Sequence, residues 1–102
     1  MSQAAVSLDA SGRLCLSGVL DYRSGAALRS QGQQLIKGSS ASQLLVDCSA
    51  VSKSSSVGVS LLLGFMRDAA QAGKPMKVSG LPRDMAQIAD VSGVRSLFDI
   101  QD

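Results

Sequence analysis

The sequence predicts a single-domain α/β protein, a mixed sheet of four to five strands with helices packed on it, in the order β-β-α-β-α-β-α-(β). Three observations predict this class. Short apolar runs of strand length alternate with longer stretches that have the period of a helix. The first two strand-like runs follow one another directly, as in a hairpin. The 102 residues, of which 45% are hydrophobic, suit one packed domain that spans residues 1–102.

The N-terminal hairpin is predicted from alternation on both sides of a glycine. Residues 4–9 alternate weakly between apolar and polar, and residues 13–17 alternate clearly. Gly12 supplies the turn between them, and Gly18 ends the second strand.

The first helix is predicted between a capping residue and a glycine. Asp21 or Ser24 suits the N-cap, and apolar residues then recur to about Ile36. Lys37 in the last turn and Gly38 after it are typical of a helix end.

The third strand, a serine-rich loop and the longest helix come next. Residues 43–48 are apolar on both faces, which predicts a central strand. Residues 49–55 are almost all small and polar and predict a loop. The helix over residues 56–72 ends at Gly73. Because this helix begins on serines, its first N–H groups have only hydroxyls to cap them, and we expect its first turn to suit an anion, a phosphate or an acidic side chain of a partner.

The remaining residues predict a fourth strand, a short helix and one last element. Residues 76–79 alternate as a strand, and Pro82 stands near the first position of a helix, where proline is tolerated. Residues 94–100 predict a short strand or a helical turn. The apolar residues that we expect these elements to bury are Met85, Ile88, Ala89, Val91, Leu97, Phe98 and Ile100.

The long helix carries two apolar rows rather than one. The first follows the i, i+3, i+4, i+7 rule and must face the sheet. The second is interpreted as a protein-docking face with Phe65 as its anchor, since apolar patches rimmed by polar groups mark interfaces. The alternative is that the second row packs under a neighbouring helix or the C-terminal segment. The first row is Val59, Leu62, Leu63, Met66 and Ala70; the second is Val57, Leu61 and Phe65, with Arg67 and Asp68 at the rim.

The composition argues against enzymatic, nucleic-acid-binding and membrane-spanning roles. The chain has no histidine, which removes the commonest general base and transition-metal ligand. A net charge of +2 with one Tyr and two Phe disfavours nucleic-acid binding. The longest apolar stretch is far short of the roughly 20 residues of a membrane span, and no signal peptide is recognised, so we expect a cytoplasmic protein with no direct membrane insertion. Cys15 and Cys48 lie in apolar runs and are expected to be buried structural thiols.

Other chemistries have weaker support. Asp21 and Asp47 each end a strand and could form an acid/base pair, but turn or cap roles are favoured. Lys53 among serines suggests a Ser–Lys dyad or a nucleotide site, although the P-loop spacing is missing and nothing in the sequence desolvates the lysine. Two carboxylates and two thiols are too few for a metal site. We therefore assign no catalytic residue, metal or cofactor.

One run of the chain resembles the STAS domain, the family named for sulfate transporters and anti-anti-sigma factors. Residues 45–51, LVDCSAV, are followed by SSVGV at 55–59 and by three leucines at 61–63. They are similar to the family pattern D-L-S-G-V, then D-S-S-G or D-T-G-G opening a leucine-rich helix. The predicted order of elements also resembles the family fold along nearly the whole chain. The resemblance implies a STAS-like fold and a binding role without catalysis.

Two branches of the family differ at the start of this helix. In anti-anti-sigma factors a partner kinase phosphorylates the second Ser of D-S-S-G; here that position is Val57, and Ser55 replaces the motif Asp. The other branch is the small cytoplasmic STAS subunit of the Mla ABC transporter, which moves phospholipid between the inner and outer membranes of Gram-negative bacteria. Those subunits have a hydroxyl residue at the position of Ser56 and none at that of Val57, so this sequence is most similar to them.

The second branch implies a function and a set of partners. The subunit binds the ABC ATPase subunit, and through it the permease, at the inner membrane, and supports outer-membrane lipid asymmetry. An anti-anti-sigma-type regulator that binds a kinase-like anti-sigma factor stays as the alternative. The residues assigned to partner binding, by this resemblance and by the second apolar row, are Ser54, Ser55, Ser56, Val57, Leu61, Phe65 and Arg29.

Overall fold

The sheet of this protein is mixed, and its strands lie side by side in chain order, β1-β2-β3-β4-β5. The computed structural model describes residues 3–101. The first two strands are antiparallel, and the other neighbouring pairs are parallel. The predicted class and order of elements are therefore confirmed. The elements are β1 (Ala5–Leu8), β2 (Leu14–Leu20), α1 (Gly25–Gly38), β3 (Leu44–Ser54), α2 (Ser56–Gln71), β4 (Met76–Ser79), α3 (Arg83–Val91), a 3-10 turn (Arg95–Leu97) and β5 (Asp99–Gln101).

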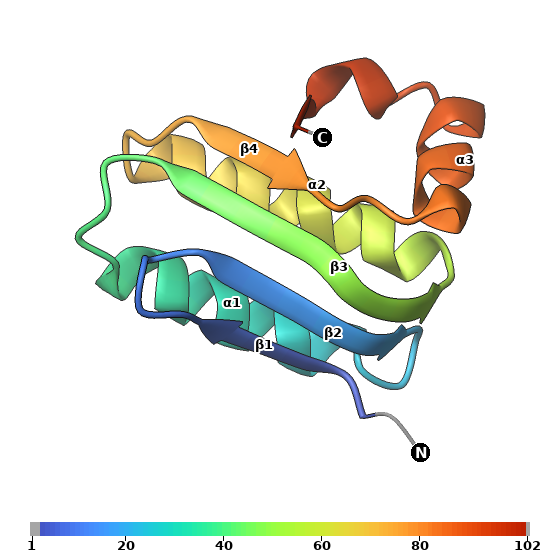
Figure 1. Ribbon diagram of the computed structural model, residues 1–102, viewed down its shortest axis with the longest axis horizontal. Helices are drawn as coiled ribbons and strands as arrows, with labels where there is room; N and C mark the ends of the chain where they lie inside the picture. The colour runs from blue at the N-terminus through green and yellow to red at the C-terminus, as the bar shows by residue number, and fades with distance from the viewer. Residues whose placement is uncertain (1–2, 102) are drawn as a thin grey trace.

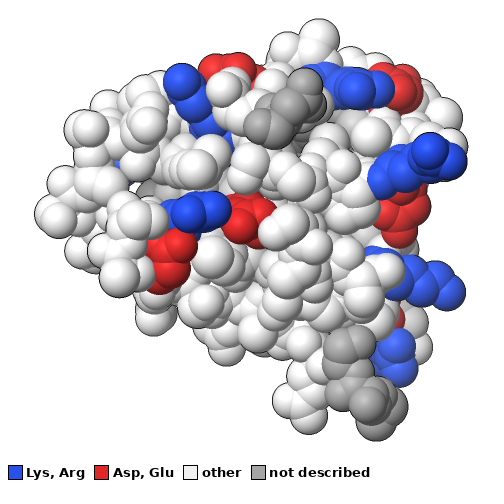
Figure 2. Space-filling view, viewed as in Figure 1, with Lys and Arg blue, Asp and Glu red and all other residues white. Residues whose placement is uncertain are grey.

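Two layers make up most of the molecule. Helices α1 and α2 cover one face of the sheet, and α3 lies at the end of the sheet where α2 begins (Figure 1). Burial alternates along β2, where Leu14 and Leu16 are fully buried beneath the helices and Cys15 is half-buried on the other face. That other face carries few charged groups, and they lie mostly in pairs of opposite sign (Figure 2). The central strand β3 is therefore covered on one face and not on both.

The structure corrects the boundaries of two predicted elements. β2 runs on to Leu20, past Gly18, whose positive φ of 82° and tight approach to Gln3 suit glycine alone. β3 runs on to Ser54, so the predicted loop over residues 49–55 is wrong. Parallel pairing with β2 holds this segment, with irregularities in its register, and buries Val51. Ladder hydrogen bonds use the backbone, so the serine side chains do not prevent the strand.

Four predicted burials also fail, and the first is that of Ala70 in the first apolar row of α2, which is exposed. Val91 at the end of α3 is 90% exposed and Leu97 is 55% exposed, whereas Phe98, next in the chain, is buried. Cys15 is half-buried on the uncovered face, whereas Cys48 is fully buried and its pKa is raised to about 12 by burial. Both cysteines are free thiols.

Candidate docking surface

A shallow hollow of about 200 Å³ lies between the N-terminal ends of α1 and α2. The two helices run side by side on the sheet, and both begin at the same end of it (Figure 1). Small residues of α1 and the first turns of α2 leave the space between them open. The lining residues are Gly25, Ala26, Arg29, Val57, Ser60 and Leu61.

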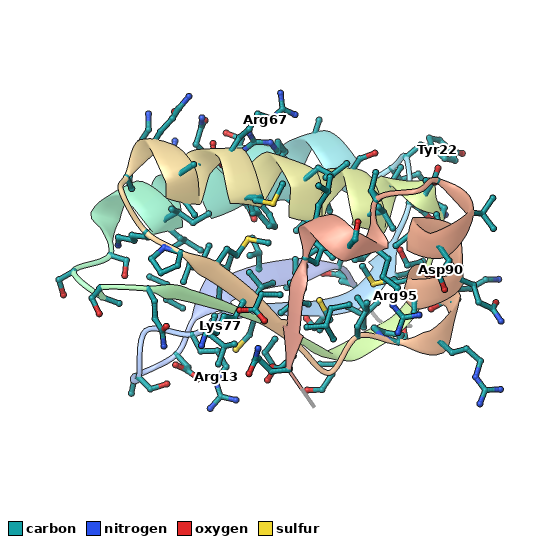
Figure 3. All side chains as sticks on the ribbon, turned by 90° about the horizontal axis from the view of Figure 1, so that it is seen from above. Arg13, Tyr22, Arg67, Lys77, Asp90 and Arg95 are labelled. Atoms are coloured by element: carbon teal, nitrogen blue, oxygen red, sulfur yellow. The ribbon has the colours of Figure 1, made fainter. Side chains whose placement is uncertain are left out.

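The turn before α1 is held by Asp21. Its carboxylate accepts from the N–H of Arg23 at 3.0 Å and from the guanidinium at 2.7 Å. Those hydrogen bonds from Arg23 lower the pKa of Asp21. Ser24 takes the N-cap position, but its hydroxyl does not cap the helix; it donates to the carbonyl of Val19. Tyr22 stands out from this turn with 85% of its surface exposed, at the end of the molecule where α2 begins (Figure 3).

Ser55 is the N-cap of α2. Its hydroxyl accepts from the N–H of Val57 at 3.2 Å, and its carbonyl accepts from the N–H of Gly58 at 3.1 Å. Its own N–H donates to the carbonyl of Leu20, which ties the start of the helix to the end of β2. Ser56, the first helical residue, is exposed. The first turn of α2 thus uses N–H groups of residues 57 and 58 internally, which reduces its capacity for an outside anion.

Ser54 points inward, contrary to its predicted place on the surface. It is 8% exposed, its N–H donates to the carboxylate of Asp84 at 3.0 Å, and its hydroxyl donates to the carbonyl of Ser55 at 2.7 Å. Gly58 makes room for it, since a Cβ there would lie 2.0 Å from the Ser54 hydroxyl oxygen. Ser54 therefore joins β3 to α3 and is not available to a partner.

The second apolar row of α2 packs against α1. Phe65 is fully buried and Leu61 is 3% exposed, so the predicted free apolar face is wrong and the alternative of packing under a neighbouring helix is correct. Gly32 of α1 faces the ring closely, because a Cβ there would come within 2.3 Å of a ring carbon. Leu61 still forms the floor of the hollow. Phe65 is fully buried and does not line the hollow, so it cannot be an exposed anchor.

An ion pair closes the interface next to Phe65. Arg29 donates to Asp68 through its two terminal guanidinium nitrogens, at 2.5 and 3.1 Å, and lies over the Phe65 ring at 6.0 Å. Gly64 leaves the space that this guanidinium fills. Asp68 is 6% exposed, so its predicted place at an exposed rim is wrong. The charge of Arg29 serves the contact between α1 and α2, and about a third of its side chain, 33%, stays exposed.

The predicted residues thus separate into two groups. Ser55 and Ser56 lie at the surface beside the hollow, and Val57, Leu61 and Arg29 line it, whereas Ser54 and Phe65 are internal. Sequence reasoning missed four residues of this surface. Two features of the sequence could have indicated them. One is the single tyrosine in the polar turn before α1, and the other is the start of α1 on glycine and alanine, which have no large side chains. The missed residues are Tyr22, Gly25, Ala26 and Ser60.

The arrangement presents a surface that is suited to contact with another molecule. Within residues 3–101 no group of three or more His, Cys, Asp or Glu side chains could hold a metal ion. In the same part of the chain no helix has the length and apolar character to cross a membrane. Residues 49–54 form a strand instead of a loop, so they do not wrap around a phosphate. The hollow itself offers apolar carbon atoms bordered by hydroxyl groups.

Comparisons with known proteins agree with this architecture. A family model described as "Mlab, STAS domain" matches residues 4–99. An anti-sigma factor antagonist from Mycobacterium paratuberculosis is similar in structure, with a TM-score of 0.76 at 21% identity over 96% of this chain and 83% of the other. The unphosphorylated anti-sigma factor antagonist SpoIIAA is similar with a TM-score of 0.73 at 16% identity over 98% and 89%. A STAS domain protein from Planctomyces limnophilus has a TM-score of 0.72 at 13% identity over 100% and 91%. No curated protein sequence matches the chain.

These three structural matches have identities of 21% or less and establish the fold, whereas the family model covers almost the whole chain. This chain belongs to the STAS-domain family, and within it to the type that the model describes as Mlab.

Proposed function

We propose that this STAS domain is a non-catalytic subunit of an ABC transporter complex that maintains outer-membrane lipid asymmetry. It binds the ATPase subunit, supports its assembly and activity, and through it associates with the permease at the cytoplasmic side of the inner membrane. The match of the Mlab family model to residues 4–99 carries the proposal. Val57 adds to it, because the position that holds the phosphorylated serine in anti-anti-sigma factors has no hydroxyl here.

The docking surface for that ATPase consists of the residues that line the hollow, together with Tyr22, Ser55 and Ser56 beside it. Tyr22 offers a large exposed ring, and Ser56 and Val57 border the hollow on the α2 side. Tyrosine is enriched at sites that dominate binding energy, and hydroxyl groups suit the polar rim of an interface. Arg29 contributes the exposed third of its side chain.

A second candidate is a regulator that binds a kinase-like anti-sigma factor. The similarity of this fold to anti-sigma factor antagonists favours it. The two candidates place the partner on the same end of the molecule, so they differ in the identity of the partner and in whether a hydroxyl is phosphorylated. Ser56 is the exposed hydroxyl nearest to the family site.

Capture of the tagged protein from membranes solubilised in mild detergent, followed by mass spectrometry, tests the proposal. We expect an ABC ATPase and its permease. Ser56→Asp should abolish their recovery, because an unpaired charge is costly in a desolvated interface. Ala70→Asp is the matched control, since it adds the same charge to an exposed position near the far end of the same helix. Recovery of a soluble kinase-like protein without any membrane component would replace the proposal by the second candidate.

A further inference from the structure

The hollow between α1 and α2 differs in chemistry from the anion site that the serine-rich helix start predicted. Its exposed lining is almost entirely apolar. Four of its residues, Gly25, Ala26, Val57 and Leu61, present only carbon atoms from their side chains, or no side chain at all. Ser60 adds one hydroxyl at its edge.

The one cationic residue of the lining is already neutralised. The guanidinium of Arg29 is bound by both carboxylate oxygens of Asp68, which is buried, and it also stacks over Phe65. A bidentate pair of this kind uses the directed donors of the guanidinium. An incoming phosphate or carboxylate would have to compete with Asp68, which is part of the same molecule and already in place.

Two N–H groups on each side of the hollow have acceptors within the protein. On the α2 side, the N–H groups of Val57 and Gly58 donate to Ser55. On the α1 side, the N–H groups of Ser24 and Gly25 donate to the carbonyl of Asp21 at 3.1 Å. These internal hydrogen bonds reduce the number of N–H groups that an anion could use at this place, although each helix start has a positive end.

We propose that the hollow receives an uncharged apolar side chain of the partner, of the size of leucine, methionine or phenylalanine, and not an acidic or phosphorylated group. This inference rests on the proposed function, since it specifies what the partner places at the docking surface. A volume of about 200 Å³ is sufficient for one such side chain and too small for a helix. Apolar anchors in small pockets are the usual centres of binding energy in protein interfaces.

Two neighbouring alanines provide the test. Ala26 and Ala27 are both exposed on the first turn of α1, but only Ala26 of these two lines the hollow. Lys and Glu are introduced at each position, and binding of the purified ABC ATPase subunit is measured by calorimetry, with melting curves to verify folding. We expect A26K and A26E to weaken binding equally, by about tenfold or more, because either charge is desolvated there. A27K and A27E should stay near the wild-type affinity.

The sign of the effect discriminates between the alternatives. An acidic or phosphorylated partner group would make A26K bind better and A26E worse, and that result would overturn the inference. Unchanged affinity of both Ala26 variants would also overturn it, while leaving the ATPase as the partner.

A second measurement on the isolated protein separates failure of this inference from failure of the proposed function. Amide NMR spectra are recorded with isopropanol and, separately, with inorganic phosphate. We expect isopropanol to shift the amides of the lining residues and phosphate to leave them in place. Lining amides that respond to phosphate, or to neither probe, would overturn the inference. Lack of ATPase binding by the wild type together with the isopropanol response would reject the proposed function alone.

Discussion

Between α1 and α2, the stretch around Phe65 is filled with side chains, whereas the stretch around Val57, about two turns nearer to the start of α2, holds an open hollow. Glycine occurs in both places with different effects. Gly32 is in contact with an aromatic ring that occupies the space its missing side chain leaves, while Gly25 borders space that is only partly filled. We call the first the closed stretch and the second the open stretch.

The difference shows how one helix pair serves two purposes. The closed stretch holds the helices together through the Phe65 ring and the Arg29–Asp68 pair, so the open stretch can remain unfilled. Substitutions in the closed stretch should therefore change the free energy of unfolding, and those in the open stretch should change partner binding. Substitutions from Phe65 to Ser60, with expected effects that decrease in that order, test this division.

Phe65→Ala should have the largest effect. The ring is fully buried in contact with Gly32 and Arg29, and its removal leaves a cavity that the rigid helix backbones cannot fill. We expect a loss of about 3 to 5 kcal/mol in the free energy of unfolding, measured by urea denaturation. A loss below about 1 kcal/mol would mean that the closed stretch does not hold the helices together.

Asp68→Ala should come next. It leaves the Arg29 guanidinium beside the core without its partner, although the exposed third of that side chain still reaches water. We expect a loss of about 2 to 3 kcal/mol. Asp68→Asn, which retains the shape and one acceptor, should recover part of it. Equal losses in both variants would assign the effect to charge alone and not to the hydrogen bonds.

Gly32→Ala and Gly25→Ala compare the two stretches with the same change. At Gly32 the new Cβ would lie 2.3 Å from the buried ring, so we expect a net loss of about 1 to 2 kcal/mol after the gain in helix propensity. At Gly25 it would lie 2.9 Å from a methyl group of Val57, which can turn toward the hollow, and we expect a change within about 0.5 kcal/mol. Thermal melts of the two variants measure both changes in stability. If the two variants lose similar stability, the closed and open stretches do not differ in packing.

Ser60→Ala should have the smallest effect on stability. Ser60 is exposed at the edge of the hollow on α2, so we expect the free energy of unfolding to change by less than about 0.5 kcal/mol. Because an apolar side chain enters beside it, the affinity for the ATPase subunit should stay the same or rise slightly. A clear loss of affinity with unchanged stability would show that this hydroxyl donates to or accepts from the partner.

The order of elements was predictable because hydrophobic periodicity and glycine positions are local properties. Gly12, Gly38 and Gly73 lie close to the ends of elements. The alternation of apolar and polar residues over 13–17 indicates a strand that is covered on one face. The extension of β3 through the serines was not predictable from local composition, since pairing with β2 determines it.

The candidate site was predictable in position and only partly in detail. The apolar row of Val57, Leu61 and Phe65 did indicate that something packs on this side of α2. A helical wheel cannot tell whether that surface meets a neighbouring helix or a partner, because both bury the same kind of side chain. The inward position of Ser54 could not be predicted from local sequence either, since it depends on a hydrogen bond to Asp84, which lies thirty residues away in the chain.

The fold class, the order of the elements and the similarity of the first turn of α2 to the STAS family follow from local sequence, because each depends on residues close together in the chain. Which half of the α1–α2 interface is closed depends on the tertiary structure. That choice depends on contacts between residues about forty positions apart, such as Arg29 and Asp68, whose distance and burial no local pattern contains. The same contact neutralises the charge of Arg29 in the lining of the hollow. For this reason we propose that the hollow receives an uncharged side chain of the partner.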